Sequence, residues 1–230
     1  MRRMIFGTGS GRCGTWSLYT LLKQQLNTLS AHEGVPLPWE QDLTIFWRSI
    51  FRLQIHPETL AGDKHLILAN TSFVWINYIG EIMSHFLFPK VICLKRDRQE
   101  VIESFMNYNE SNPWVDPESE HFDGHGKSSS LFPKYDLPKD EAIGAYWDEF
   151  YNIADYWADK FPESFKIFPT DALNHKSTVL DMLNFMEIPE KNQNVHVGIR
   201  FNLRDKPKGD IARKVKLEDG VLNLAGAACQ

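Results

Sequence analysis

A glycine-rich turn within residues 5–18 carries the clearest chemistry in the sequence. A short apolar run leads into the turn and a helical pattern follows it; the glycines are Gly7, Gly9, Gly11 and Gly14. Because glycine has no Cβ, such a turn can direct several backbone N–H groups at an anion, and the next helix adds its positive N-terminal dipole. Arg12 adds a fixed charge, and Thr15 and Ser17 add hydroxyl donors. The pattern therefore predicts a phosphate-binding turn.

The turn departs from two common nucleotide-binding patterns. A Walker loop ends in Lys and Ser or Thr, whereas Thr15 and Trp16 follow Gly14 here. Three of the glycines have dinucleotide-type G-x-G-x-x-G spacing, but the next acidic residues, Glu40 and Asp42, follow a proline-interrupted segment rather than a second strand. A tight strand-to-helix turn without a ligand is the alternative for this segment taken alone.

A second candidate anion site lies in residues 90–108, which read as a strand, a charged break and an amphipathic helix. Arg96 stands at the carboxyl end of the strand, and Ser104 follows it by eight residues, slightly more than two helical turns. These two side chains can converge on a second phosphate. The alternative is that Arg96 pairs with Asp97 or Glu100 on a solvated edge.

Together the two segments resemble the PAPS-dependent sulfotransferases, whose donor is 3′-phosphoadenosine 5′-phosphosulfate (PAPS). The 5′-phosphosulfate loop of that family is matched by Arg12, Cys13, Gly14, Thr15, Trp16 and Ser17. Its 3′-phosphate element is matched by Arg96, Asp97 and Ser104. The resemblance extends over residues 3–189 and is closer to the carbohydrate and bacterial-type members than to the cytosolic members that use a histidine base. It implies a P-loop sulfotransferase fold.

The resemblance also implies roles for the loop residues. Arg12 occupies the place of the family's loop lysine and would stabilise the bridging oxygen, although arginine and lysine are not equivalent there. Backbone N–H groups from Gly11 to Thr15, with the Thr15 hydroxyl, would hold the 5′-phosphate. Trp16 departs from the family's second threonine, and Ser17 is a substitute for the lost hydroxyl.

The general base is expected in the dipeptide His32-Glu33, just after the second predicted strand. Carbohydrate members of the family often use a glutamate from this region, whereas cytosolic members use a histidine after the third strand. The corresponding stretch here is Asn70-Thr71-Ser72, which has no histidine. Glu33 is therefore the expected base, with His32 as an alternative base or an orienting partner. A cap or salt bridge for Glu33 and a buried structural imidazole for His32 are the competing interpretations.

The pattern of apolar residues predicts alternating strands and helices. The expected strands are 3–7, 27–31, 65–70, 90–95 and 165–168, and the expected helices are 14–26, 40–53, 74–86, 98–108, 139–160 and 176–186. This order is typical of an α/β fold with three layers, α/β/α, around a mostly parallel central sheet. Ligands in such sheets lie beyond the carboxyl ends of the strands, where both candidate phosphate elements fall.

The chain is expected to form a single sulfotransferase domain over residues 1–230. The long segment 109–138 is either disordered or a lid over the acceptor, and 190–230 has an uncertain role. The segment 190–230 contains a basic group that is only loosely similar to the nucleotide-binding loop near the C-terminus of family members. This group comprises Arg200, Arg204, Lys206, Lys208 and Arg213. The segment 109–138 contains several acidic and histidine residues whose spacing is not that of metal ligands. They are Asp116, Glu118, Glu120, His121, Asp123 and His125. The aromatic side chains Trp147, Tyr151, Tyr156 and Trp157 favour helix packing over a sugar platform.

Composition narrows the cellular context. A net charge of −5 argues against a nucleic-acid partner. The three cysteines, Cys13, Cys93 and Cys229, do not suggest a disulfide framework, and no apolar run approaches the 18 residues of a membrane span. We therefore expect a soluble, cytoplasmic protein without a signal peptide or transmembrane segment, and no oligomeric state is indicated.

The expected function is transfer of a sulfuryl group from PAPS to a hydroxyl acceptor, a carbohydrate or a small hydroxylated metabolite. The product of the donor is 3′,5′-adenosine bisphosphate (PAP), and no metal is expected. Two alternatives remain open. An atypical P-loop kinase or NTPase would need an acidic residue after an apolar strand to hold Mg²⁺, and a noncatalytic nucleotide-binding module would need only the binding elements.

Overall fold

A five-stranded, all-parallel sheet forms the centre of the computed structural model, which describes residues 3–33, 37–55, 67–107, 114, 120–122 and 128–198. The strands are β1 (Arg3–Thr8), β2 (Thr28–His32), β3 (Ile67–Thr71), β4 (Lys90–Lys95) and β7 (Phe165–Pro169), in the spatial order β2-β3-β1-β4-β7. Each neighbouring pair is parallel. The expected parallel sheet is confirmed.

The helices occupy the positions that the sequence predicts, most of them with shorter ends. The helix expected at 139–160 matches its predicted range, and the one expected at 40–53 is displaced to Leu43–Ile55. The helices are α1 (Thr15–Lys23), α2 (Leu43–Ile55), α4 (Ile79–His85), α5 (Arg98–Met106), α6 (Lys139–Lys160) and α7 (Lys176–Phe185). Short 3₁₀ helices are η1 (Phe73–Tyr78), η3 (Thr170–Asn174) and η4 (Glu190–Asn192). The helix expected at 74–86 is thus an α-helix only in its second half, because η1 forms the first turns.

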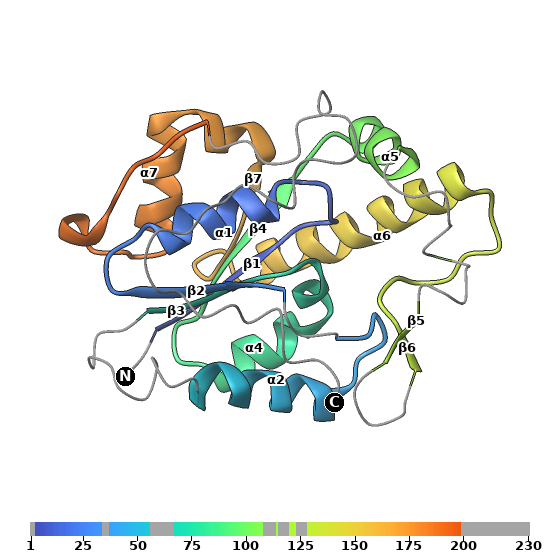
Figure 1. The fold of residues 1–230 in the computed structure, drawn as a ribbon, viewed down its shortest axis with the longest axis horizontal. Helices are drawn as coiled ribbons and strands as arrows, with labels where there is room; N and C mark the ends of the chain where they lie inside the picture. The colour runs from blue at the N-terminus through green and yellow to red at the C-terminus, as the bar shows by residue number, and fades with distance from the viewer. Residues whose placement is uncertain are drawn as a thin grey trace, which may run out of the picture.

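Two apolar layers cover the sheet, as strand periodicity requires. Along β1, Met4 and Phe6 face a core that includes residues of α2, η1, α4, α5 and α6. The intervening Ile5 faces a second core built with α1 and α7. Figure 1 shows α1 and α7 on one side of the strands and α2 and α4 on the other. The three-layer α/β/α fold class is confirmed.

The strand order changes direction at β1. The chain passes from β1 to β2 at one edge and returns through β3, whereas β4 and then β7 extend the sheet on the other side of β1. The connections on either side of such a switch point diverge and leave a crevice at the carboxyl ends of the strands, where α/β proteins bind ligands. The glycine-rich turn, residues 9–14, leaves β1 at this point.

Two short strands interrupt the segment 109–138, for which the sequence predicts no regular element. They are β5 (Glu120–Phe122) and β6 (Ser128–Ser130), which pair antiparallel. Strands of three residues, one of them composed of serine, carry no apolar alternation that a sequence pattern can detect. Further along, the Phe132 ring stacks on Phe73 of η1 at a centroid distance of 4.8 Å. This end of the segment therefore packs on the domain.

No helix within the described residues combines the length and apolar character that a membrane crossing requires.

The glycine-rich turn lies directly against the carboxyl end of β4. A Cβ added to Gly9 would stand 2.3 Å from Cys13 Sγ and 2.7 Å from the Leu94 carbonyl oxygen. Contacts this short cannot be accommodated without moving backbone, because the carbonyl belongs to the sheet. Glycine at this position therefore allows the turn and the neighbouring strand to pack.

Replacing Gly9 with alanine tests this packing. We expect Gly9→Ala to lower the free energy of unfolding, measured by urea denaturation, by about 1–3 kcal/mol because the methyl group overpacks the turn. Gly80→Ala is the control: its methyl would lie 3.3 Å from the half-buried Trp157 ring in a helix, so the change should stay within about 1 kcal/mol. Unchanged stability of the Gly9 variant would contradict the close packing.

Candidate functional site

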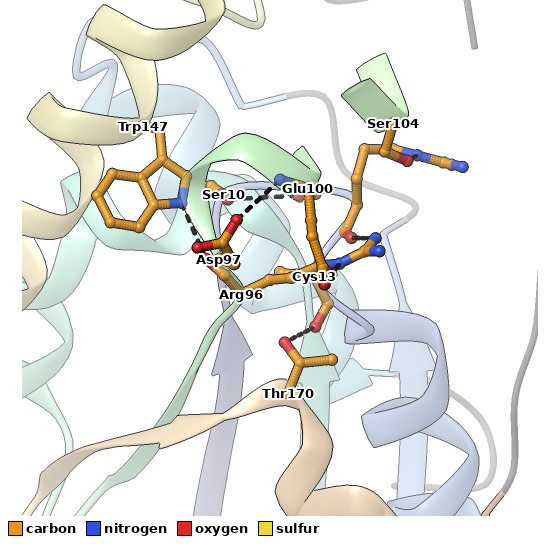
Figure 2. A network of polar contacts seen from close by, with 10 residues as sticks. Ser10, Cys13, Arg96, Asp97, Glu100, Ser104, Trp147 and Thr170 are labelled. Carbon is orange, nitrogen blue, oxygen red and sulfur yellow. Dashed lines mark hydrogen bonds and ion pairs between the residues drawn. The ribbon is translucent and has the colours of Figure 1, made fainter. Parts of the chain in front are cut away.

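The two predicted anion-binding segments are in direct contact. Arg12 Nε, in the glycine-rich turn, donates to Ser104 Oγ of α5 at 3.1 Å. Arg96 Nη1, at the carboxyl end of β4, donates to the Arg12 carbonyl oxygen at 3.0 Å. Figure 2 shows Arg96 and Ser104 close to the turn, around Cys13. The structure thus brings Arg12, Arg96 and Ser104, far apart in sequence, to one place.

The backbone of the turn has the left-handed conformations that form an anion-binding concavity. Gly11 has φ 78°, Arg12 has φ 54° and Gly14 has φ 92°. The conformation of Arg12 is the energetically unfavourable one of the three, because a residue with a Cβ is strained at positive φ. Gly14 is also the N-cap of α1 and provides no side chain to cap it. The first N–H groups of α1, which have no partners within a helix, are therefore not satisfied by an N-cap side chain.

The Arg96 side chain has two partners among the described residues. Its Nε donates to Glu100 Oε2 at 2.7 Å, one helical turn along α5, in addition to the Nη1 contact with the turn. The side chain remains 26% exposed. Arg96 therefore forms the ion pair with Glu100 that the sequence offered as an alternative, and it also contacts the main chain of the turn at Arg12. Asp97 has a separate role, since its Oδ1 accepts the Glu100 N–H at 3.0 Å and caps α5.

Helix α6 supports both segments from behind, a role that the sequence analysis missed. Trp147 Nε1 donates to the Arg96 carbonyl oxygen at 3.1 Å, as Figure 2 shows. One turn later, the buried Tyr151 hydroxyl donates to the Leu94 carbonyl oxygen at 2.7 Å and lies 3.3 Å from Ser10 Oγ. Of the four aromatic side chains predicted to pack, Trp147 and Tyr151 do so and also fix the end of β4. Trp157 packs against the core as well, whereas Tyr156 is 54% exposed. No pattern in the sequence distinguishes the second role of Trp147 and Tyr151 from packing.

An ion pair adds a second link between α5 and α6. Arg98 Nε lies 3.0 Å from Asp148 Oδ1, and Arg98 Nη2 lies 2.8 Å from Asp148 Oδ2. Gly144 makes room for this guanidinium, because a Cβ there would be 2.5 Å from Arg98 Nη2. The helix that carries Ser104 is therefore oriented by contacts at its first turn.

His32 ends β2 and is held from two sides. Its Nδ1 lies 2.7 Å from Thr71 Oγ1 at the end of β3, and its Nε2 lies 3.7 Å from Glu33 Oε1. The rings of Trp16 and Tyr19 stand 4.8 Å and 5.8 Å from the imidazole. Burial lowers the pKa of His32 to about 4, against the smaller opposing effect of the Thr71 carbonyl. The imidazole is consequently neutral at neutral pH.

Glu33 follows in a left-handed conformation, with φ 51°. Its N–H donates to the Thr71 carbonyl oxygen at 2.8 Å, and its carbonyl accepts from Asn70 Nδ2 at 3.4 Å. The side chain is 53% exposed, while the part that contacts protein is desolvated enough to raise the pKa of the carboxyl group. Asn70 and Thr71 thus position His32 and Glu33.

The remaining loop residues differ in what they expose. Cys13 is fully buried, and burial raises the pKa of its thiol to about 12, so it is neutral and contributes only its backbone. Thr15 is also buried, whereas the Trp16 side chain is 45% exposed beside His32. Ser17 is partly exposed on α1.

Two groups from the sequence analysis lie wholly or partly outside the described residues. All of the basic group lies outside them, namely Arg200, Arg204, Lys206, Lys208 and Arg213. Of the acidic and histidine group, four members lie outside them, namely Asp116, Glu118, Asp123 and His125. Among the described residues, no group of three or more His, Cys, Asp or Glu side chains could hold a metal ion.

Comparisons with known proteins bear on the fold. No family model matches the sequence, and no curated protein matches it. Among solved structures, the sulfotransferase domain from the curacin biosynthetic pathway is similar with a TM-score of 0.57 and 15% identity, over 82% of this chain and 75% of that one. Shikimate kinase from Bacteroides thetaiotaomicron matches over 81% of this chain and 98% of that one, with 10% identity, and its TM-score of 0.34 is too low to bear on function. The chain has a P-loop sulfotransferase-like fold.

Proposed function

We propose that this protein is a sulfotransferase that moves a sulfuryl group from PAPS to a hydroxyl acceptor, a carbohydrate or a small hydroxylated metabolite. One observation carries the proposal: the glycine-rich turn and α5 meet through Arg12 and Ser104, with Arg96 bonded to the same turn. The two ends of an adenosine bisphosphate need two anion sites side by side. The likeness of the fold to a sulfotransferase domain supports this assignment.

The chemical character of the site fits a doubly phosphorylated donor. The N-terminus of α1 and the turn offer N–H groups for the 5′-phosphosulfate, and Arg12 can stabilise negative charge that develops on the bridging oxygen. Arg96 and Ser104 offer a charged and a hydroxyl donor for the 3′-phosphate. The 3′-phosphate would compete with Glu100 for Arg96, because that carboxylate holds Nε at 2.7 Å.

The reaction is an in-line displacement at sulfur. The acceptor oxygen forms the new S–O bond, the bond between sulfur and the bridging oxygen of PAPS breaks, PAP leaves, and the acceptor proton passes to a base. Glu33 suits the base, because its carboxylate is accessible and its raised pKa makes it a better proton acceptor than an ordinary glutamate. His32 suits an orienting role, because it is neutral and lies between Thr71 and Glu33.

A P-loop kinase is the less favoured alternative. Magnesium-dependent phosphoryl transfer uses a carboxylate at the end of an apolar strand, but β3 ends in Asn70-Thr71 and β4 leads into Lys95-Arg96. Cationic groups at that edge suit an additional phosphate better than a metal ion. The remaining alternative, a module that binds a nucleotide without turnover, is distinguished by the base variant below.

Nucleotide titration tests the donor assignment. By calorimetry we expect PAP to bind at least about tenfold more tightly than adenosine 5′-phosphate, because a hydrogen bond to a charged group contributes about 1.5–3 kcal/mol. Binding and sulfuryl transfer should be insensitive to EDTA, and ATP should not replace PAPS as the donor. Arg96→Gln should remove most of the preference for PAP, whereas Arg48→Gln, the same charge change at an exposed residue of α2, should preserve it. Equal affinities for the two nucleotides in the wild type would refute the 3′-phosphate site.

Replacing Glu33 tests the base. Glu33→Gln should leave PAP affinity within about twofold and lower kcat by about 10²–10⁴. In the wild type, kcat should rise with pH through the pKa of Glu33, which lies above its ordinary value near about 4.3, because only the carboxylate accepts the proton. His32, whose pKa burial lowers to about 4, is retained in Glu33→Gln, so the rise should be lost in that variant. An unchanged kcat in Glu33→Gln would remove Glu33 from the mechanism.

A further inference from the structure

We propose that Thr170, at the start of η3, is a positioning residue that sets the direction of the N–H groups in the glycine-rich turn. The effect of this orientation on donor binding rests on the proposed function. Thr170 Oγ1 donates to the Cys13 carbonyl oxygen at 2.8 Å. In Figure 2 the Thr170 hydroxyl points at this carbonyl from the side of the turn opposite Ser104.

The geometry of the peptide bond converts that contact into a constraint on the next amide. In a planar trans peptide, the C=O of one residue and the N–H of the next point in opposite directions. Thr170 holds the Cys13 carbonyl, so the Gly14 N–H is directed away from Thr170. Arg96 holds the Arg12 carbonyl in the same way and so orients the Cys13 N–H. Two successive peptide planes of the turn are therefore fixed through their carbonyl groups.

This part of the turn needs an external restraint. Gly14 is the most permissive residue type and has φ 92°, and Arg12 is held in an unfavourable left-handed conformation. A turn of this kind loses its N–H alignment when its peptide planes are free to rotate. An anion site is effective only when its donors are already oriented before the anion arrives.

Thr170 also contacts the turn through its methyl group. A Cβ added to Gly14 would lie 3.2 Å from Thr170 Cγ2, so the methyl group packs closely over the glycine. The side chain therefore provides two separable contributions, a hydrogen bond and a van der Waals contact. Valine retains the shape without the hydroxyl, and serine retains the hydroxyl without the methyl group.

Thr170 links the outer strand of the sheet to the glycine-rich turn. Thr170 follows β7, the strand that pairs with β4 at the outer edge, and begins η3. Its contact joins residues 157 apart in sequence. Through it, the outer strand and the short helix that follows it contribute to the orientation of the donor-binding turn.

Thr170→Val is the decisive variant, and Thr178→Val is its matched control. Thr178 Oγ1 donates to the carbonyl oxygens of Ala172 and His175 in the same region, without a contact to the turn. Losing one hydrogen bond of about 0.5–1.5 kcal/mol corresponds to a factor of about 2–13. We expect Thr170→Val to weaken PAP and adenosine 5′-phosphate by the same factor in this range, because both carry the 5′-phosphate. Thr170→Ser should bind within about twofold of wild type.

A purely structural role for Thr170 makes a different prediction. In that case Thr170→Val and Thr178→Val would lower Tm alike and leave nucleotide affinity unchanged, and this result would overturn the proposal. The amide resonances of Cys13 and Gly14 in the ligand-free protein provide a second readout by NMR. They should shift and broaden in Thr170→Val but not in Thr178→Val, and unaltered resonances would equally overturn the proposal.

The two readouts separate this inference from the proposed function. If the wild-type protein binds no PAP while the Cys13 and Gly14 resonances respond to Thr170→Val, the donor assignment fails and the positioning role stands. If the wild type binds PAP and Thr170→Val binds it equally, the positioning role fails and the donor assignment stands.

Discussion

The contact of the glycine-rich turn with Ser104 of α5 and with Arg96, which precedes that helix, is the interaction on which the candidate site depends. It consists of two hydrogen bonds, Arg12 to Ser104 and Arg96 to the Arg12 carbonyl oxygen. Each alone is worth little in a solvated setting, but here they join two strand ends of a rigid parallel sheet. Glu100 pairs with the Arg96 guanidinium, and an anionic ligand that replaces this carboxylate gains an existing arrangement of donors.

The sheet determines why this contact is possible. Since β1 and β4 are adjacent and parallel, the segments that follow them emerge at the same edge, and the reversal of strand order at β1 keeps that edge open. Supporting contacts then come from elements more distant in sequence. Tyr151 and Trp147 of α6 hold the backbone at the end of β4, and Thr170 after β7 holds the turn. These contacts engage main-chain carbonyl oxygens, so they restrain the backbone without occupying N–H groups. Within the turn, the Gly11 N–H, one of the predicted donors, is bonded to the Gly9 carbonyl oxygen at 2.7 Å.

The sequence indicated much of this arrangement because the relevant signals are local. The break from an apolar run into glycines predicted the turn after β1, and the position of Arg96 at the carboxyl end of a strand predicted that it lies at the same edge of the sheet as the turn. The supporting residues were not identifiable. Thr170 is an ordinary polar residue in the sequence, and its partner lies 157 residues away. Tyr151 and Trp147 were interpreted as packing residues, because no periodicity distinguishes a buried aromatic side chain from one that also donates to a distant carbonyl. The strands β5 and β6 were not predicted because three residues are too few to show a periodic pattern.

The central claim is that one nucleotide spans the turn and α5. A crystal structure of the protein with PAP tests it most directly. The account predicts a single PAP molecule with its 5′-phosphate against the backbone of residues 11–15 and its 3′-phosphate against Arg96 and Ser104, with the Glu100 carboxylate displaced from Arg96. A nucleotide that contacts only one of these elements, or that binds elsewhere on the protein, would contradict the account.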